Sequence, residues 1–112
     1  MDKRNWISVL IIVLIIMFSI IILNTSASSI SEEDAKCIGK NSELYVQLGC
    51  HACETQEKMF NENYKYLNVI DCFYEKDECI KKEISATPTW IINENKYLGV
   101  QSLEELKELA GC

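Results

Sequence analysis

Two cysteines separated by two residues, Cys50 and Cys53, are the side chains of this sequence best suited to chemistry. They follow an apolar run at 44–48 that predicts a strand, and they open a segment at 54–64 that predicts a helix. A cysteine at a helix N-terminus lies near unpaired backbone N–H groups and the positive end of the helix dipole, which stabilise its thiolate. The second cysteine, one turn further on, can attack a mixed disulfide that the first has formed. The spacing therefore favours a pair that alternates between dithiol and disulfide.

Metal binding is the alternative chemistry for these cysteines. Cys50 and Cys53 could be half of a structural zinc site completed by Cys72 and Cys79. The wide spacing of the second pair is a poor match to zinc ribbons, so we expect no metal and no cofactor other than the Cys50–Cys53 disulfide itself.

His51 lies between the two cysteines, and two interpretations of it stay open. Its imidazolium form stabilises a neighbouring thiolate, or its side chain is simply solvated.

The overall composition limits the class of protein. The chain has 112 residues, six cysteines and a formal net charge of −6. This acidic balance argues against nucleic acid as a partner. So many cysteines in a short chain indicate an oxidising compartment, where disulfides persist. We expect one small domain that disulfides help to stabilise, acting as a monomer and joined to an attachment segment.

An uncharged apolar run of 18 residues, interrupted only by two serines, occupies positions 6–23. A helix of this length nearly spans the hydrocarbon core of a bilayer. Because Lys3 and Arg4 precede the run, the positive-inside rule places the N-terminus in the cytoplasm. We expect a single-pass anchor in the cell membrane and an extracytoplasmic catalytic domain, with a signal peptide cleaved at 25–27 as the alternative.

The division of the chain follows from this run. Residues 1–30 are expected to be the cytoplasmic N-terminus, the anchor and a short linker, and residues 31–112 the exported domain. Its predicted elements begin with a helix of at most two turns that ends at Gly39. Strands follow at 43–48 and 66–71 with the cysteine helix between them, and then a helix within 75–84 and a strand led in by 85–92. The hairpin partner of that strand is predicted at 96–98, and a last helix begins at the capping box at Ser102 and stops at Gly111. The order (α)βαβαββα predicts an α/β fold.

These features together resemble a known family. A CxxC pair at a strand–helix junction, a single proline before a strand, a hairpin and a final helix resemble the thioredoxin fold. A narrower resemblance, to the thioredoxin-like partner domain of bacterial vitamin K epoxide reductase homologues, covers residues 44–111 and is carried by Asp71-Cys72, Glu78-Cys79, Thr87-Pro88-Thr89-Trp90-Ile91-Ile92 and Gly99-Val100-Gln101-Ser102-Leu103-Glu104-Glu105-Leu106. It implies a compact thioredoxin-like fold, a four-stranded mixed sheet flanked by helices, after the single transmembrane helix.

The resemblance also implies roles for individual residues. Cys50 and Cys53 would be the catalytic pair, with Cys50 the more exposed sulfur. Pro88 would be a cis-proline, and Thr87 and Pro88 together would form the backbone edge against which a client's extended chain lies. Two positions depart from the family, which usually has an aromatic residue in place of Gly49 and often Pro-His in place of His51-Ala52. The redox potential is therefore not carried over.

Four cysteines remain, and they allow three pairings. The resemblance implies a structural disulfide between Cys72 and Cys79, which match a paired position of the family. Cys37 and Cys112 are then left as the second structural pair, outside the part of the chain that the resemblance covers.

The function that the resemblance implies is protein thiol–disulfide exchange. Client proteins would be oxidised, and their electrons would pass to a vitamin K epoxide reductase-like integral membrane enzyme and then to quinone. One alternative is a disulfide reductant or isomerase that another membrane carrier supplies. A thioredoxin-fold copper chaperone belongs to a different class and usually adds a distal histidine, whereas His51 is the only histidine here. A purely structural disulfide domain is the third alternative.

Overall fold

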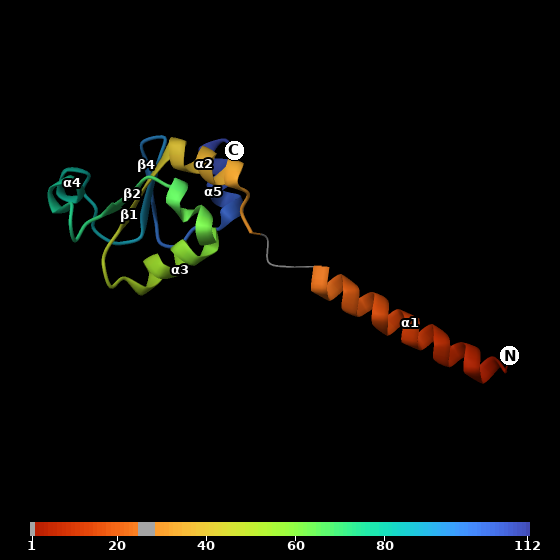
Figure 1. Ribbon diagram of the computed structural model, residues 1–112. Helices are drawn as coiled ribbons and strands as arrows, with labels where there is room; N and C mark the ends of the chain where they lie inside the picture. The colour runs from red at the N-terminus through yellow and green to blue at the C-terminus, as the bar shows by residue number, and fades with distance from the viewer. Residues whose placement is uncertain (1, 25–28) are drawn as a thin grey trace.

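The computed structural model describes residues 2–24 and 29–112 (Figure 1). The alternative cleavage site at 25–27 lies outside these residues. In chain order the elements are α1 (Lys3–Asn24), α2 (Glu32–Asn41), β1 (Ser42–Val46), α3 (His51–Phe60), the 3₁₀ helix η1 (Asn61–Tyr66), β2 (Val69–Asp71), α4 (Lys76–Lys81), β3 (Thr89–Ile92), β4 (Asn95–Leu98) and α5 (Leu103–Ala110).

The first helix, α1, contains the apolar run. Its span Lys3–Leu23 is long and apolar enough to cross a membrane, and none of it is buried. Large apolar side chains cover it on every side, as on a helix surrounded by lipid. A signal sequence near an N-terminus has the same length and composition, so the membrane anchor stays a prediction.

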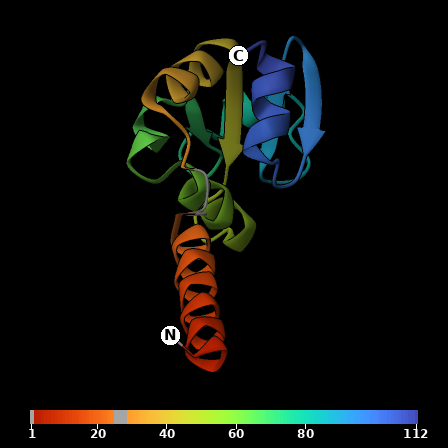
Figure 2. The ribbon, with the colours of Figure 1, turned by 90° about the vertical axis from the view of Figure 1, so that its right-hand side faces the viewer.

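The domain is built on a four-stranded sheet in the order β2-β1-β3-β4. β1 pairs with β2 in parallel and with β3 antiparallel, and β3 and β4 form an antiparallel hairpin. In Figure 2, β1 runs through the middle of the domain. The sheet is therefore mixed and flanked by helices, which confirms the predicted fold class.

Alternation along the strands divides the core between the two faces of the sheet. Leu44 and Val46 of β1 and Trp90 and Ile92 of β3 are buried on the face that α2, α3 and α5 cover. On the opposite face Tyr45 and Ile70 form a smaller cluster with Cys79, which belongs to the short helix α4. Figure 1 shows α4 at the far end of the domain from α2 and α5. The cysteine helix α3 lies with α2 and α5 on the face of the sheet that carries the larger core cluster.

The prediction that the first helix of the domain ends at Gly39 is wrong, because α2 continues to Asn41. Gly39 is buried inside the helix, where η1 packs against it. A Cβ at this position would collide with the carbonyl oxygen of Tyr66. The glycine is therefore required by the close approach of another segment and not by the end of its own helix.

The predicted helix at 54–64 and the predicted strand at 66–71 both have different bounds in the structure. α3 ends at Phe60 because Asn61, with a φ of 51° and a ψ of −131°, leaves the helical conformation. The chain continues as η1, which Leu67 closes by donating its N–H to the Tyr64 carbonyl oxygen. Only Val69–Asp71 remain to pair with β1.

Candidate active site

The cysteine pair lies where β1 passes into α3. After Val46 the chain turns back, and the Cys50 N–H donates to the Gln47 carbonyl oxygen at 3.0 Å. Gly49 has a φ of +83°, a backbone conformation that would be strained in a residue with a side chain. Cys50 is the N-cap of α3, and its Sγ accepts a hydrogen bond from the Cys53 N–H at 3.1 Å. A sulfur in this position is a better acceptor as a thiolate, so the helix N-terminus favours the reduced, ionised form of Cys50.

Cys50 and Cys53 form a disulfide. Cys53 is 5% exposed and belongs to the main core cluster, whereas Cys50 is only half-buried at its edge. Cys50 is therefore the more accessible sulfur of the pair, as the resemblance implies.

A second segment, far along the sequence, completes the site. The Thr87–Pro88 peptide bond is cis, as the resemblance implies. The Thr87 carbonyl oxygen lies 3.7 Å from the Cys50 Sγ. On its other side, the Pro88 carbonyl oxygen accepts a hydrogen bond from the Gly99 N–H at 2.8 Å. The structure thus brings Cys50, Cys53, Thr87 and Pro88 together in one place.

Cys50 and Cys53 are among the residues that line a cavity of about 510 Å³, and this lining is acidic. The carboxylates of Glu54, Glu57, Asp71 and Glu75 line it, and none of its lining residues is basic. Burial, followed by the nearby charges of Glu57 and Asp71, raises the pKa of Tyr64 to about 12. The cavity therefore carries a negative potential beside the disulfide.

The chain has a thioredoxin-like fold. The sheet order, the cysteine pair at the N-terminus of α3 and the cis-proline next to it establish this arrangement. Two solved structures show a weak overall similarity to the chain. The alkylhydroperoxide reductase AhpF of Enterococcus faecalis, as its C503A mutant, has a TM-score of 0.47 and 18% identity over 74% of this chain and 45% of that chain. The NTD_N/C domain of the same reductase has a TM-score of 0.46 and 16% identity, with the same coverage.

One relative with a named activity is similar to the chain in sequence. The thiol-disulfide oxidoreductase LTO1 of Arabidopsis thaliana is 34% identical over 101 residues, covering 78% of this chain and 27% of that protein. The chain thus spans about a quarter of the length of this relative. No protein-family model matches the chain.

The single histidine lies outside the cavity. The His51 side chain is 94% exposed, and its Nδ1 is 3.9 Å from Oε2 of Glu54, one turn along α3. This position agrees with the solvated interpretation. Stabilisation of the Cys50 thiolate by its imidazolium form stays a prediction.

Asp71, at the end of β2, supports the loop that presents Cys50. Its Oδ1 accepts hydrogen bonds from the Leu48 N–H at 3.2 Å and the Phe73 N–H at 2.9 Å. The carboxylate thereby ties the turn before the cysteine pair to the turn that carries Cys72. This role of Asp71 is not predicted from the sequence. The bond to Phe73 is a local aspartate turn with a sequence signal, but the bond to Leu48 spans 23 residues and has none.

The other four cysteines form two further disulfides. Cys72 is bonded to Cys79, which joins the end of β2 to α4, and Cys37 is bonded to Cys112, which joins α2 to the second residue after α5. Cys72 and Cys79 are therefore not assembled with Cys50 and Cys53 as a zinc site. Among residues 2–24 and 29–112, no group of three or more His, Cys, Asp or Glu side chains is arranged to hold a metal.

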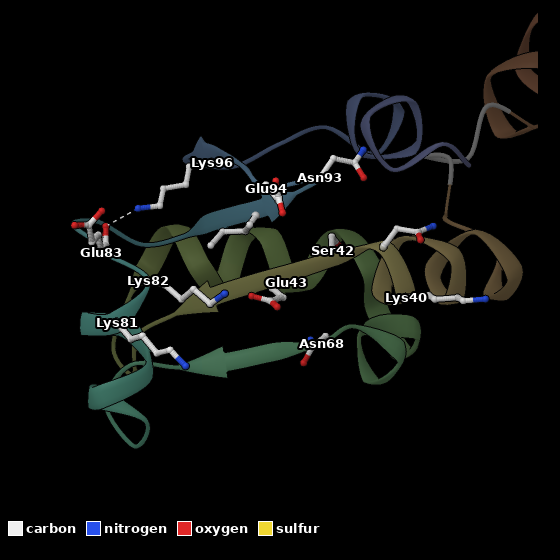
Figure 3. Close-up of a pocket in the computed structure, with 12 residues that line it drawn as sticks. Lys40, Ser42, Glu43, Asn68, Lys81, Lys82, Glu83, Asn93, Glu94 and Lys96 are labelled. Carbon is white, nitrogen blue, oxygen red and sulfur yellow. Dashed lines mark hydrogen bonds between the residues drawn. The ribbon is translucent and has the colours of Figure 1, made fainter.

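A separate cavity of about 490 Å³ lies at the other end of β1, on the face of the sheet opposite α3 (Figure 3). Both lysines and glutamates line it, and the Lys96 Nζ donates to the Glu83 carbonyl oxygen at 2.9 Å. The charged lining residues are Lys40, Glu43, Lys81, Lys82, Glu83, Glu94 and Lys96. This mixed lining contains no cysteine, and the cavity takes no part in the chemistry of the disulfide.

Proposed function

We propose that this chain is a membrane-anchored, extracytoplasmic thiol–disulfide oxidoreductase that accepts electrons from client protein thiols. The observation that carries the proposal is the Cys50–Cys53 disulfide, with Cys50 at a helix N-terminus and beside the Thr87 carbonyl oxygen. The similarity to a named thiol-disulfide oxidoreductase supports the same class of chemistry.

The geometry supports a two-step exchange. A client thiolate attacks the Cys50 Sγ, the Cys50–Cys53 bond breaks, and Cys53 leaves as a thiolate that takes up a proton. A second client thiolate then attacks the client sulfur of the mixed disulfide, and Cys50 leaves as a thiolate that the Cys53 N–H stabilises. The client gains a disulfide, and the chain retains two electrons as a dithiol. In the reverse direction, Cys53 resolves the mixed disulfide.

The backbone at 87–88 would hold the client during this exchange. Proline has no N–H to donate, so hydrogen bonds to an extended client segment must come from Thr87. An extended segment aligned on this edge would carry its cysteine sulfur past the Cys50 Sγ, 3.7 Å from the Thr87 carbonyl oxygen.

The electron acceptor in this proposal is a vitamin K epoxide reductase-like membrane enzyme that passes the electrons on to quinone. The family resemblance of residues 44–111 supports this partner, and an anchored domain would meet it at the membrane surface. The experiment is to follow the redox state of Cys50–Cys53 in cells with and without the candidate membrane enzyme. We expect the dithiol to accumulate in its absence. A pair that stays oxidised without it would reject this partner.

The direction of exchange is tested by the redox potential. The helix N-terminus stabilises the Cys50 thiolate, whereas the acidic cavity opposes it, so we expect an intermediate potential. Equilibration of the protein against glutathione measures it. A value below about −300 mV, as in structural disulfides, would exclude the oxidant role and favour the reductant alternative.

The proposed topology has its own test. Reagents that alkylate cysteines and cannot cross a membrane should label the reduced domain in intact cells, because α1 would leave the domain outside. Labelling that requires lysis would reverse the topology.

A further inference from the structure

Gln56 is a fully buried polar side chain in the cysteine helix. It lies on α3 one turn after Cys53 and is 0% exposed. A buried amide lowers stability unless its donors and acceptor have partners. Its Oε1 accepts hydrogen bonds from the Trp90 Nε1–H at 3.1 Å and from the Gln101 N–H at 2.7 Å. Its Nε2 donates to the Gln101 carbonyl oxygen at 3.1 Å.

These partners belong to the segments that hold the client-binding edge. Trp90 is on β3, two residues after Pro88. Gln101 lies between β4 and α5, and Gly99 in the same segment donates its N–H to the Pro88 carbonyl oxygen. One amide therefore connects the cysteine helix to Pro88 by two routes, one along the strand and one through the loop.

We propose that Gln56 is a positioning residue that sets the gap between the Cys50 Sγ and the Thr87–Pro88 edge. The inference depends on the proposed exchange function and adds to it the device that aligns sulfur and client. Cys50 caps the same 10-residue helix that carries Gln56, so a shift of the helix moves the sulfur with it. An apolar core at this point would allow the helix to slide, whereas three hydrogen bonds to two segments fix its register.

Gln56→Met keeps the length and apolar packing of the side chain but removes its polar atoms. It leaves the Trp90 Nε1–H and both backbone groups of Gln101 without their partner, so α3 must move for them to find others. Gln56→Glu keeps both acceptor bonds and loses the Nε2–H groups that donate to the Gln101 carbonyl oxygen and to the Met59 sulfur. Protonation of the glutamate restores one donor.

The test compares two substrates of the reduced full chain in detergent micelles. A cysteine-containing peptide disulfide lies along the Thr87–Pro88 edge, whereas hydroxyethyl disulfide needs only the Cys50 sulfur. In both reactions the chain is oxidised to its disulfide, and the substrate disulfide is reduced to two thiols. We expect Gln56→Met to slow the peptide reaction by about tenfold and the small-molecule reaction by no more than about twofold.

The control is Ile38→Val, a core substitution on α2 at a side chain that is 0% exposed and forms none of the hydrogen bonds of the amide network. It should lower the melting temperature by leaving a cavity and keep the ratio of the two rates. Gln56→Glu should recover the wild-type ratio as the pH is lowered, which a merely structural role of Gln56 does not predict. If Gln56→Met fails to fold, the pH dependence of the rate ratio in Gln56→Glu tests the positioning role by itself.

The outcomes separate the two proposals. A wild-type chain that reacts with neither substrate rejects the proposed function itself. A wild-type chain that reacts with both, together with Gln56 variants whose rate ratio is unchanged at every pH, rejects only the positioning role.

Discussion

The Cys50–Cys53 and Cys37–Cys112 disulfides are the same covalent bond in two different settings. The first joins residues three apart at the start of α3, and the second joins residues 75 apart at the two ends of the domain. Accessibility alone does not separate them, since Cys37 is half-buried, as Cys50 is, and Cys112 is exposed. The differences are the helix N-terminus that stabilises a Cys50 thiolate, the acidic cavity and the neighbouring Thr87 edge.

The comparison shows that loop length and chemical surroundings give the two disulfides different roles. A bond across 75 residues removes much conformational freedom from the unfolded chain, whereas one across three residues removes little. The short bridge can therefore open and close at little cost to the fold, and the long one cannot.

The largest expected effect comes from removing the cysteines of the short bridge. Cys50→Ser should reduce exchange to background, because no sulfur remains at the helix N-terminus. In Cys53→Ser, the Cys50 thiolate should attack a client disulfide and stay trapped as a mixed disulfide, which non-reducing gels detect. The double variant Cys37→Ser/Cys112→Ser is the control and should keep exchange per folded molecule. If it lost exchange while folded, the division between the two bridges would be wrong.

The long bridge should dominate stability. From chain entropy, loss of Cys37–Cys112 should cost roughly 4–5 kcal/mol, and loss of Cys72–Cys79 roughly 2–3 kcal/mol, because the second loop is much shorter. Urea unfolding of each cysteine-to-serine double variant, followed by tryptophan fluorescence of the buried Trp90, measures the difference. The reverse order of the two losses would contradict the entropic account.

A smaller effect concerns the charge of the client. Because carboxylates line the cavity at Cys50, peptides with arginine next to their cysteine should exchange about tenfold faster at low salt than peptides with glutamate there. Salt should reduce the ratio. Glu57→Gln should lower it further, whereas Glu104→Gln, at a residue outside this cavity, should not. A ratio that is independent of salt would remove electrostatics as its cause.

The smallest effect concerns an ion pair beside the long bridge. The Lys107 Nζ lies 3.1 Å from Oδ2 of Asp34, and hydrogen bonds from Lys107 and Ser31 lower the pKa of Asp34. Because the pKa of Asp34 is lowered by folding, its carboxylate stabilises the folded state at pH values above the ordinary aspartate pKa. This stabilisation is lost as the pH falls through the folded-state pKa. Asp34→Asn should therefore lower the melting temperature at pH 7 by about 2 °C at most. The difference should vanish in acid, and thermal scans at several pH values would show whether it does.

Local signals in the sequence were sufficient for the redox pair and for most helix ends. Ser31 and Ser102 cap α2 and α5 with their own hydroxyl groups, and Gly111 ends α5 with a φ of 74°. The start of α3 at the cysteine pair depends on residues next to one another in the chain. Such features are readable because caps, turns and apolar periodicity act over a few residues.

The resemblance supplied the place of the Thr87–Pro88 edge, but the distance between that edge and Cys50 is a property of the folded chain. The same is true of the Asp71 bond to Leu48, the Gln56 amide network and the clash that requires Gly39 to be glycine.

The sequence by itself therefore determined which residues carry the chemistry and which helix presents them, because those signals lie within one or two turns of chain. The tertiary structure alone decided what surrounds the sulfurs. Gln56 and Gln101 are 45 residues apart, and Cys50 and Thr87 are 37 apart. A hydrogen bond across such a separation exists only when the sheet has brought the two segments together, and no local pattern specifies its partner.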